Sequence, residues 1–193
     1  MTELQVTCTS VQRLVVAATP VGAEGAARRV PDAQELLDFL KIVGAETDFL
    51  LCDENGIEGL TLEGEQSWIT ETLKAPNTKM FVGVVDGEIV LVCDVRAAAR
   101  KRVAHSAGVA ISIKRAYWRL GIGGIAMQAM IDFAKSTGFL RSLLLEVREG
   151  NDRAKALYER FGFVEVGRHK ARINVRGTYY DEILMDLDLT QAK

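Results

Sequence analysis

The amino-acid sequence predicts a single domain of mixed α/β or α+β class, spanning residues 1–193, and three patterns support this prediction. Two apolar segments flank the dipeptide Asp86-Gly87, which suits the positive φ angles of a type I′ hairpin turn. Apolar residues recur at helical spacing after three glycines at positions 121, 123 and 124. The run LRSLLLEV is apolar enough for a strand that is buried on both faces. A chain of 193 residues can also bury a core without disulfides or metal.

The N-terminal part is predicted to form one strand and two helices. VQRLVVAA, residues 11–18, has the composition of a strand. PDAQELLDFLKIVGAE, residues 31–46, is predicted to be a helix because its apolar residues recur on one face. An acidic loop then covers residues 48–61, and GEQSWITETLK, residues 64–74, is predicted to be the second helix.

The rest of the chain supplies strands and helices in alternation. The predicted order is β-α-α-β-β-β-α-β-α-β-β, which defines the mixed class. In chain order these elements are hairpin strands 80–85 and 88–95, a strand at 103–113, a helix from the glycines to Gly138, a strand at 140–147, a helix at 151–162, and two strands at 163–175 and 178–189.

Composition and charge exclude several classes of function. The net charge of −2 gives no electrostatic basis for binding nucleic acid. With three cysteines, no CxxC spacing and two histidines, the chain is expected to bind no metal and to occupy a reducing compartment. No apolar run approaches the roughly 20 residues that span a bilayer. We therefore expect a soluble, cytoplasmic protein without a membrane or nucleic-acid partner.

The glycine cluster is the first candidate for a binding site. Glycines at a helix start allow backbone N–H groups without an internal partner to approach an anion, phosphate above all. A P-loop is excluded because IAMQ, and no Lys-Ser/Thr pair, follows Gly124. The spacing Gly121-x-Gly123-x-x-Ala126, with Glu146 near the end of the next strand, also fits a dinucleotide fingerprint. Polar KRAYWRL separates the strand from the first glycine, which weakens the resulting alternative, an NAD-dependent oxidoreductase.

A second motif, N-x-x-A-x-x-L-Y-x-x-x-G-F, begins at Asn151 and follows the glycines at a characteristic distance. Together the two motifs resemble the GNAT superfamily of acyl-CoA-dependent N-acyltransferases, with the motif-bearing core at about 80–188. The resemblance implies a central mixed, mostly antiparallel sheet flanked by helices, and acetyl-CoA as the acyl donor. The residues that carry it are Arg119, Gly121, Gly123 and Gly124 in the first motif, and Asn151, Ala154, Leu157, Tyr158, Gly162 and Phe163 in the second.

The resemblance also implies residues that bind the donor. The backbone of Ile111 and Ile113 would bond the pantetheine arm, and Arg119 would assist in binding the pyrophosphate. Asn151 would contact the cofactor, although a short amide side chain at a helix start also caps free N–H groups. The N–H groups expected to hold the pyrophosphate belong to Leu120, Gly121, Ile122, Gly123 and Gly124.

The catalytic groups follow from the chemistry of a thioester and an amine. Tyr158 is implied as the group that donates a proton or hydrogen bond to the departing thiolate. A protonated amine cannot attack, so a base is needed. The segment SAGVA offers no carboxylate where many family members have a glutamate. Glu146 and His105, the latter on the same predicted face as Val109 and Ile111, are the candidates, and a water chain to solvent is equally open.

The expected activity is transfer of an acetyl group from acetyl-CoA to a primary amine by direct attack in a ternary complex. Acidic residues before and within the second predicted helix would attract a cationic amine, which favours a small-molecule acceptor. Acetylation of a protein N-terminus or lysine is the alternative. A non-catalytic acyl-CoA-binding module and the NAD-dependent oxidoreductase represent other classes. A homodimer is left open.

Overall fold

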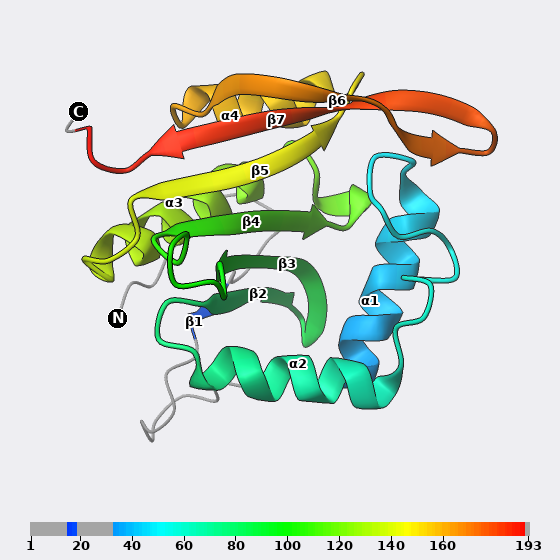
Figure 1. The fold of residues 1–193 in the computed structure, drawn as a ribbon. Helices are drawn as coiled ribbons and strands as arrows, with labels where there is room; N and C mark the ends of the chain where they lie inside the picture. The colour runs from blue at the N-terminus through cyan, green and yellow to red at the C-terminus, as the bar shows by residue number, and fades with distance from the viewer. Residues whose placement is uncertain (1–14, 19–32, 192–193) are drawn as a thin grey trace.

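The computed structural model describes residues 15–18 and 33–191, which form one seven-stranded sheet with helices on both faces (Figure 1). The order of its strands and α-helices matches the predicted order. The elements are β1 Val15–Ala18, α1 Ala33–Glu46, α2 Leu62–Lys74, β2 Lys79–Val85, β3 Glu88–Ala97, β4 Ser106–Ile113, the 3₁₀ turn η1 Arg115–Tyr117, α3 Ile122–Ser136, β5 Ser142–Arg148, α4 Asp152–Arg160, β6 Val164–Val175 and β7 Thr178–Asp188.

The sheet is mixed and mostly antiparallel, as the resemblance implied. Its strand order is β1-β2-β3-β4-β5-β7-β6, and only β4 and β5 pair in parallel. The hairpin of β2 and β3 turns at Asp86 and Gly87, whose φ angles of 50° and 83° confirm the predicted turn. In Figure 1 the strands β4 and β5 diverge toward their C-terminal ends.

Two apolar clusters cover the two faces of the sheet. The larger one joins α3 and α4 to the odd-numbered side chains at the centre of the sheet, including Leu91, Ala107 and Leu143, all fully buried. The smaller one joins α1 and α2 to β2 and β3. Residues alternate in direction along a strand, so even-numbered side chains of β4 and β5 lie on the α1/α2 side. None of the helices in the described part of the chain has the length and apolar character required to cross a bilayer.

Several boundaries differ from the prediction. The first strand is described from Val15 onward, and positions 11–14 of the predicted strand lie outside the described residues. The second helix begins two residues early because Thr61 caps it, with its Oγ1 accepting a bond of 3.1 Å from the N–H of Gly64. The strand predicted at 103–113 begins at Ser106. The three residues before it form a turn, so His105 is not part of the strand.

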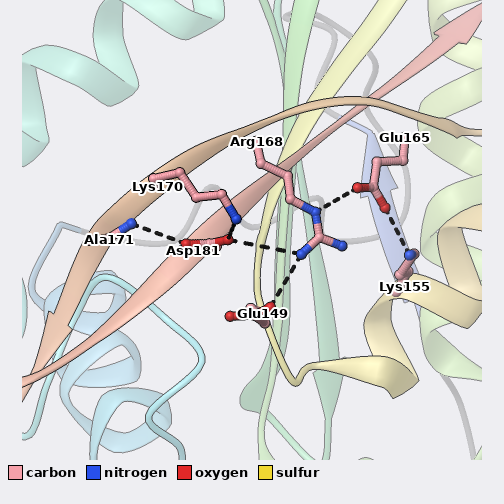
Figure 2. Close-up of polar contacts among 7 residues, drawn as sticks. All are labelled: Glu149, Lys155, Glu165, Arg168, Lys170, Ala171 and Asp181. Carbon is pink, nitrogen blue, oxygen red and sulfur yellow. Dashed lines mark hydrogen bonds and ion pairs between the residues drawn. The ribbon is translucent and has the colours of Figure 1, made fainter.

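An ionic network attaches the β6–β7 hairpin to β5 and α4 (Figure 2). At its centre, Arg168 lies 2.7 Å from Glu165 and 3.2 Å from Glu149, while Lys155 of α4 lies 2.9 Å from Glu165. Hydrogen bonds from Arg168 and Lys155 hold the pKa of Glu165 at about 2. The members of this network are Glu149, Lys155, Glu165, Arg168, Lys170, Ala171 and Asp181.

Gly44 of α1 gives a test of how the loop between α1 and α2 is held. A Cβ at Gly44 would lie 2.1 Å from the carbonyl oxygen of Asp53 in that loop. We expect Gly44→Ala to lower the free energy of unfolding by about 1–3 kcal/mol, because the clash outweighs the helix propensity of alanine. Chemical denaturation would measure this change.

Gly64→Ala in α2 is the matched control. Its Cβ would meet the Thr61 Oγ1 at 3.4 Å, an ordinary contact, so stability should stay within about 0.5 kcal/mol of wild type. An unchanged stability of Gly44→Ala would contradict the described packing of the loop.

Candidate active site

The site is built around a gap that opens where β4 and β5 separate. Only three residue pairs join the two strands, Ser106–Gly108 with Ser142–Leu144. Beyond them, residues 109–113 of β4 and 145–148 of β5 have no partner across the gap. Backbone polar groups inside a sheet need partners, so this gap is suited to an extended ligand.

The hydrogen-bond pattern shows which groups of β4 face the gap. The N–H of Lys114 donates to the carbonyl of Val90 at 3.0 Å, so the even-numbered residues of β4 bond to β3. The odd-numbered Ile111 and Ile113 therefore turn their N–H and C=O groups toward β5, as the prediction for pantetheine binding requires. Trp118 alters this pattern, because its indole Nε1 donates to the Ile113 carbonyl at 2.7 Å.

The glycine turn leads from β4 into α3. Gly121 caps the helix with φ of 82°, a left-handed conformation that favours glycine. The N–H of Gly124 donates to the Gly121 carbonyl at 3.0 Å, so Gly124, unlike the prediction, already has a partner. The first N–H groups of a helix lack intrahelical acceptors, which leaves those of Leu120 to Gly123 as the anion-binding set.

Gly123 and Gly124 also allow α4 to approach the start of α3. A Cβ at Gly123 would lie 3.1 Å from Leu157 Cδ2 and 3.5 Å from Ile113 Cδ1. A Cβ at Gly124 would lie 2.7 Å from an Arg160 side-chain nitrogen. The end of β4, the start of α3 and the middle of α4 therefore meet at one point.

Three arginines lie beside this turn and surround Trp118. Arg153 of α4 stacks on the Trp118 ring, 3.5 Å from its centroid, and Arg115 lies 5.9 Å away. Burial lowers the pKa of Arg153, and the charges of Arg119 and Arg115 lower it further. Among the described residues, none of the three forms an ion pair with a carboxylate. A cluster of unneutralised cations next to free N–H groups fits the phosphates of CoA.

Of this cluster, only Arg119 was predicted from the sequence to bind the donor. The aromatic ring of Trp118 brings Arg115 and Arg153 together, and this stacking has no spacing signature in the sequence. Lys155, two residues after Arg153, is instead bound to Glu165 in the ionic network.

The second motif forms the start and the inner face of α4. Asn151 caps the helix, as predicted, with its Oδ1 accepting a bond of 3.3 Å from Ala154 N–H. Its contact with the cofactor stays a prediction. Tyr158 is buried at 8% exposure with its ring 6.1 Å from that of Phe163. Burial raises the pKa of Tyr158 to about 12, so the phenol is neutral at physiological pH and can only donate its proton.

Two carboxylates flank the gap on the opposite face, toward α1 and α2. Asp94 of β3 pairs in register with Ala110 of β4, and Glu146 lies across the gap from Ala110, two residues beyond the last β4–β5 pair. Glu146 is exposed. Asp94 is 7% exposed, and burial raises its pKa despite the opposing charge of Arg96.

The Asp94 side chain has an oxygen that is poorly satisfied. Arg96 Nε lies 2.7 Å from Asp94 Oδ1, but among the described residues that oxygen has no hydrogen bond of acceptable geometry. A buried carboxylate of raised pKa in such a position is typical of a functional group. Asp94 could not be predicted as a site residue from the sequence, because only the strand register places it beside Ala110.

His105 does not belong to this group. It lies exposed in the turn before β4, about 16 Å along the chain direction from Ala110 at 3.3 Å per residue. The prediction that it shares a strand face with Val109 and Ile111 is wrong, because the connection after β3 extends to residue 105. In the described ranges 15–18 and 33–191, no group of three His, Cys, Asp or Glu side chains could hold a metal ion.

Comparison with known proteins agrees with this geometry. The profile of the Acetyltransferase (GNAT) family matches residues 46–163. A GNAT-family acetyltransferase from Streptococcus pneumoniae is 32% identical, with a TM-score of 0.76 over 81% of this chain and 93% of that one. No match was found among curated protein sequences.

Two more distant structures share the fold. A GCN5-related N-acetyltransferase from Kribbella flavida is 24% identical, with a TM-score of 0.69 over 89% of this chain and 98% of that chain. The yncA protein of Salmonella typhimurium, solved with its cofactor acetyl-CoA, is 14% identical, with a TM-score of 0.71 over 86% of this chain and 94% of that chain.

These matches exclude the NAD-dependent oxidoreductase and the non-catalytic module as readings of the glycine cluster. The family profile spans more than half of the chain and includes both the glycine turn and α4. The chain therefore belongs to the GNAT family of acetyltransferases, enzymes that use acetyl-CoA for N-acetylation.

Proposed function

We propose that this acetyltransferase transfers the acetyl group to the primary amine of a small molecule, by direct attack of the amine on the thioester in a ternary complex. The observation that carries the proposal is the unequal distribution of charge about the gap between β4 and β5. One end has free N–H groups and three arginines, whereas the α1/α2 face has the carboxylates of Asp94 and Glu146. An anionic donor and a cationic acceptor are thus attracted to different sides.

The donor would bind along β4 and the start of α3. The N–H groups of Leu120 to Gly123 and the cluster of Arg115, Arg119 and Arg153 would hold the phosphates. The unpaired backbone groups of Ile111 and the N–H of Ile113 would bond the pantetheine amides in the manner of an added strand.

The reaction forms a C–N bond at the thioester carbon and breaks the C–S bond. The proton leaves the attacking amine, and the thiolate gains a hydrogen bond or a proton. Full transfer from a phenol of pKa about 12 to a thiolate whose thiol has a pKa of about 8.5 is uphill by about 5 kcal/mol. Tyr158 would therefore act chiefly by donating a hydrogen bond to the departing sulfur.

We assign the role of proton acceptor to Asp94. On the α1/α2 face, β4 presents Ser106, Gly108, Ala110 and Ser112, none of which is a carboxylate. Asp94 is next to Ala110, and its raised pKa makes it a stronger base than an ordinary carboxylate. Glu146 is the second candidate because it is exposed on the same face across the gap.

The closure of the acceptor side supports a small substrate. Arg176 in the β6–β7 turn lies 3.1 Å from Asp48 in the loop after α1, so two separate segments meet at this end of the molecule. Figure 1 shows the tip of the β6–β7 hairpin beside the loop that follows α1. A protein N-terminus or lysine would need an open groove for the flanking peptide, and contact between these two segments would restrict such a groove at this end of the molecule.

Release of CoA thiol in the presence of acetyl-CoA and a panel of amines tests the proposed function. We expect turnover with one or more small primary amines and slower turnover with peptides that contain the same amine. Binding of acetyl-CoA without thiol release from any amine would contradict the proposal. Faster reaction with peptide N-termini or lysines would support the protein acetyltransferase instead.

Tyr158→Phe should lower kcat on the order of 100-fold with little change in KM for acetyl-CoA, because the hydrogen bond to sulfur strengthens only as the C–S bond breaks. Steady-state thiol release at saturating substrates measures this. Tyr179→Phe, at a position that is 64% exposed, is the matched control and should retain wild-type kcat. Full turnover by Tyr158→Phe would exclude the assigned role.

Asp94→Asn should lower kcat/KM at pH 7 on the order of 100-fold and abolish the increase that wild type shows as pH rises through the raised pKa of Asp94. The increase caused by the amine, whose own pKa is near 10, remains in both proteins. Measurement of kcat/KM from pH 5 to 9 distinguishes the two contributions.

Stability provides the control for the same variant. An acid whose folded pKa is raised destabilises the fold when it ionises, above its unfolded pKa of about 3.9. Asp94→Asn should therefore melt at the wild-type temperature or higher while losing activity. If Glu146→Gln removes the pH dependence and Asp94→Asn keeps it, the base is Glu146.

A further inference from the structure

Arg148, the last residue of β5, has two buried guanidinium nitrogens that lack an acceptor among the described residues. Its guanidinium carbon lies 3.9 Å from the centroid of the Tyr180 ring and 4.4 Å from that of Phe49. Tyr180 belongs to β7, and Phe49 belongs to the loop between α1 and α2. The Nε and Nη1 atoms are buried and have no hydrogen-bond partner in the described part of the molecule.

The two aromatic rings do not replace an acceptor. Contact with a ring face stabilises a guanidinium, but N–H groups in the guanidinium plane still need acceptors. A buried charged group without hydrogen bonds costs several kcal/mol, so such groups in native proteins mark an absent partner or a functional site. Arg148 is therefore held ready for an anion.

Three carboxylates near Arg148 are engaged with other side chains. Its register partner on β7, Glu182, lies 3.0 Å from His169 and 3.7 Å from Arg172. The adjacent Glu149 is bound to Arg168, and Asp181 lies 2.6 Å from Lys170, as Figure 2 shows. These side chains therefore do not supply the acceptor that the buried nitrogens of Arg148 lack.

The position of Arg148 relates it to the acceptor amine. Glu146 and Arg148 are two residues apart on one strand, so both side chains leave the α1/α2 face of β5 about 7 Å apart. Glu146 lies across the gap from Ala110, where the amine would attack, and Arg148 lies farther toward the open end. A negative and a positive side chain at this spacing complement a zwitterion.

We propose that Arg148 binds a carboxylate of the acceptor, and that the substrates are small amino acids acetylated on their amine. This inference rests on the proposed function and specifies its substrate class. A guanidinium and a carboxylate form paired, charge-assisted hydrogen bonds, which supply the missing acceptors. Phe49 belongs to the loop between α1 and α2, and the carboxylate would reach the buried nitrogens by displacing its ring.

The test compares amines that differ only in the carboxylate. Thiol release from acetyl-CoA is measured with each common amino acid, its carboxamide and its decarboxylated amine. Wild type should favour the carboxylate in at least one series. Arg148→Gln should then lower kcat/KM for that amino acid on the order of 100-fold, and change kcat/KM for the amide and the decarboxylated amine less than about threefold.

Two further variants distinguish binding of the carboxylate from an effect on the fold and from the loss of one positive charge. Arg148→Lys retains the charge and should restore part of the preference, because an ammonium group binds a carboxylate without the paired geometry. Arg100→Gln removes an exposed cation from the connection between β3 and β4, outside the proposed site, and should leave the preference unchanged. Melting temperature and the affinity for acetyl-CoA are measured for each variant to verify the fold.

The outcomes distinguish this inference from the proposed function. The inference alone is overturned if Arg148→Gln lowers kcat/KM equally for all three members of a series. It is also overturned if wild type acetylates amines without preference for the carboxylate. Absence of thiol release with every amine overturns the proposed function and the inference with it. If wild type prefers the carboxylate and Arg148→Gln loses that preference, the result supports both the proposed function and the inference.

Discussion

The pairing of β4 and β5 over only three residues is the constraint on which the other features of the site depend. A strand pair that ended by chance would leave unsatisfied backbone groups in the middle of the sheet, which folded proteins avoid. Here the opening is maintained from both sides. The glycine turn and α4 pack against the end of β4, and the ionic network attaches the β6–β7 hairpin to β5.

The gap also divides the molecule electrostatically. Basic side chains gather where the chain leaves β4, around Trp118, whereas the face toward α1 and α2 carries Asp94 and Glu146 with Arg148 beyond them. The net charge of the whole chain, −2, gives no indication of this division. The distribution of charge about one gap, and not its sum, would allow a nearly neutral protein to attract both an anionic donor and the cationic amine proposed as acceptor.

Features set by neighbouring residues could be predicted from the sequence, and those set by strand register could not. The turn at Asp86-Gly87, the helix after Gly121 and the cap at Asn151 depend on residues within one turn, so their patterns were sufficient. Asp94 and Arg148 acquire their surroundings from strands and loops far away in sequence. The error for His105 has the same origin, because apolar residues before Ser106 extended the alternating pattern into a turn.

The close contact of Gly123 with Leu157 has a further consequence. A Cβ at Gly123 would lie 3.1 Å from Leu157 Cδ2, so a shift of the first turn of α3 toward α4 would be passed to Leu157 and to the adjacent Tyr158. The nucleotide end of the donor, far from any bond that changes, would then help to align the phenol with the sulfur. Shortened thioesters that lack this end would reach the same strand edge but would react with a less well oriented hydrogen-bond donor.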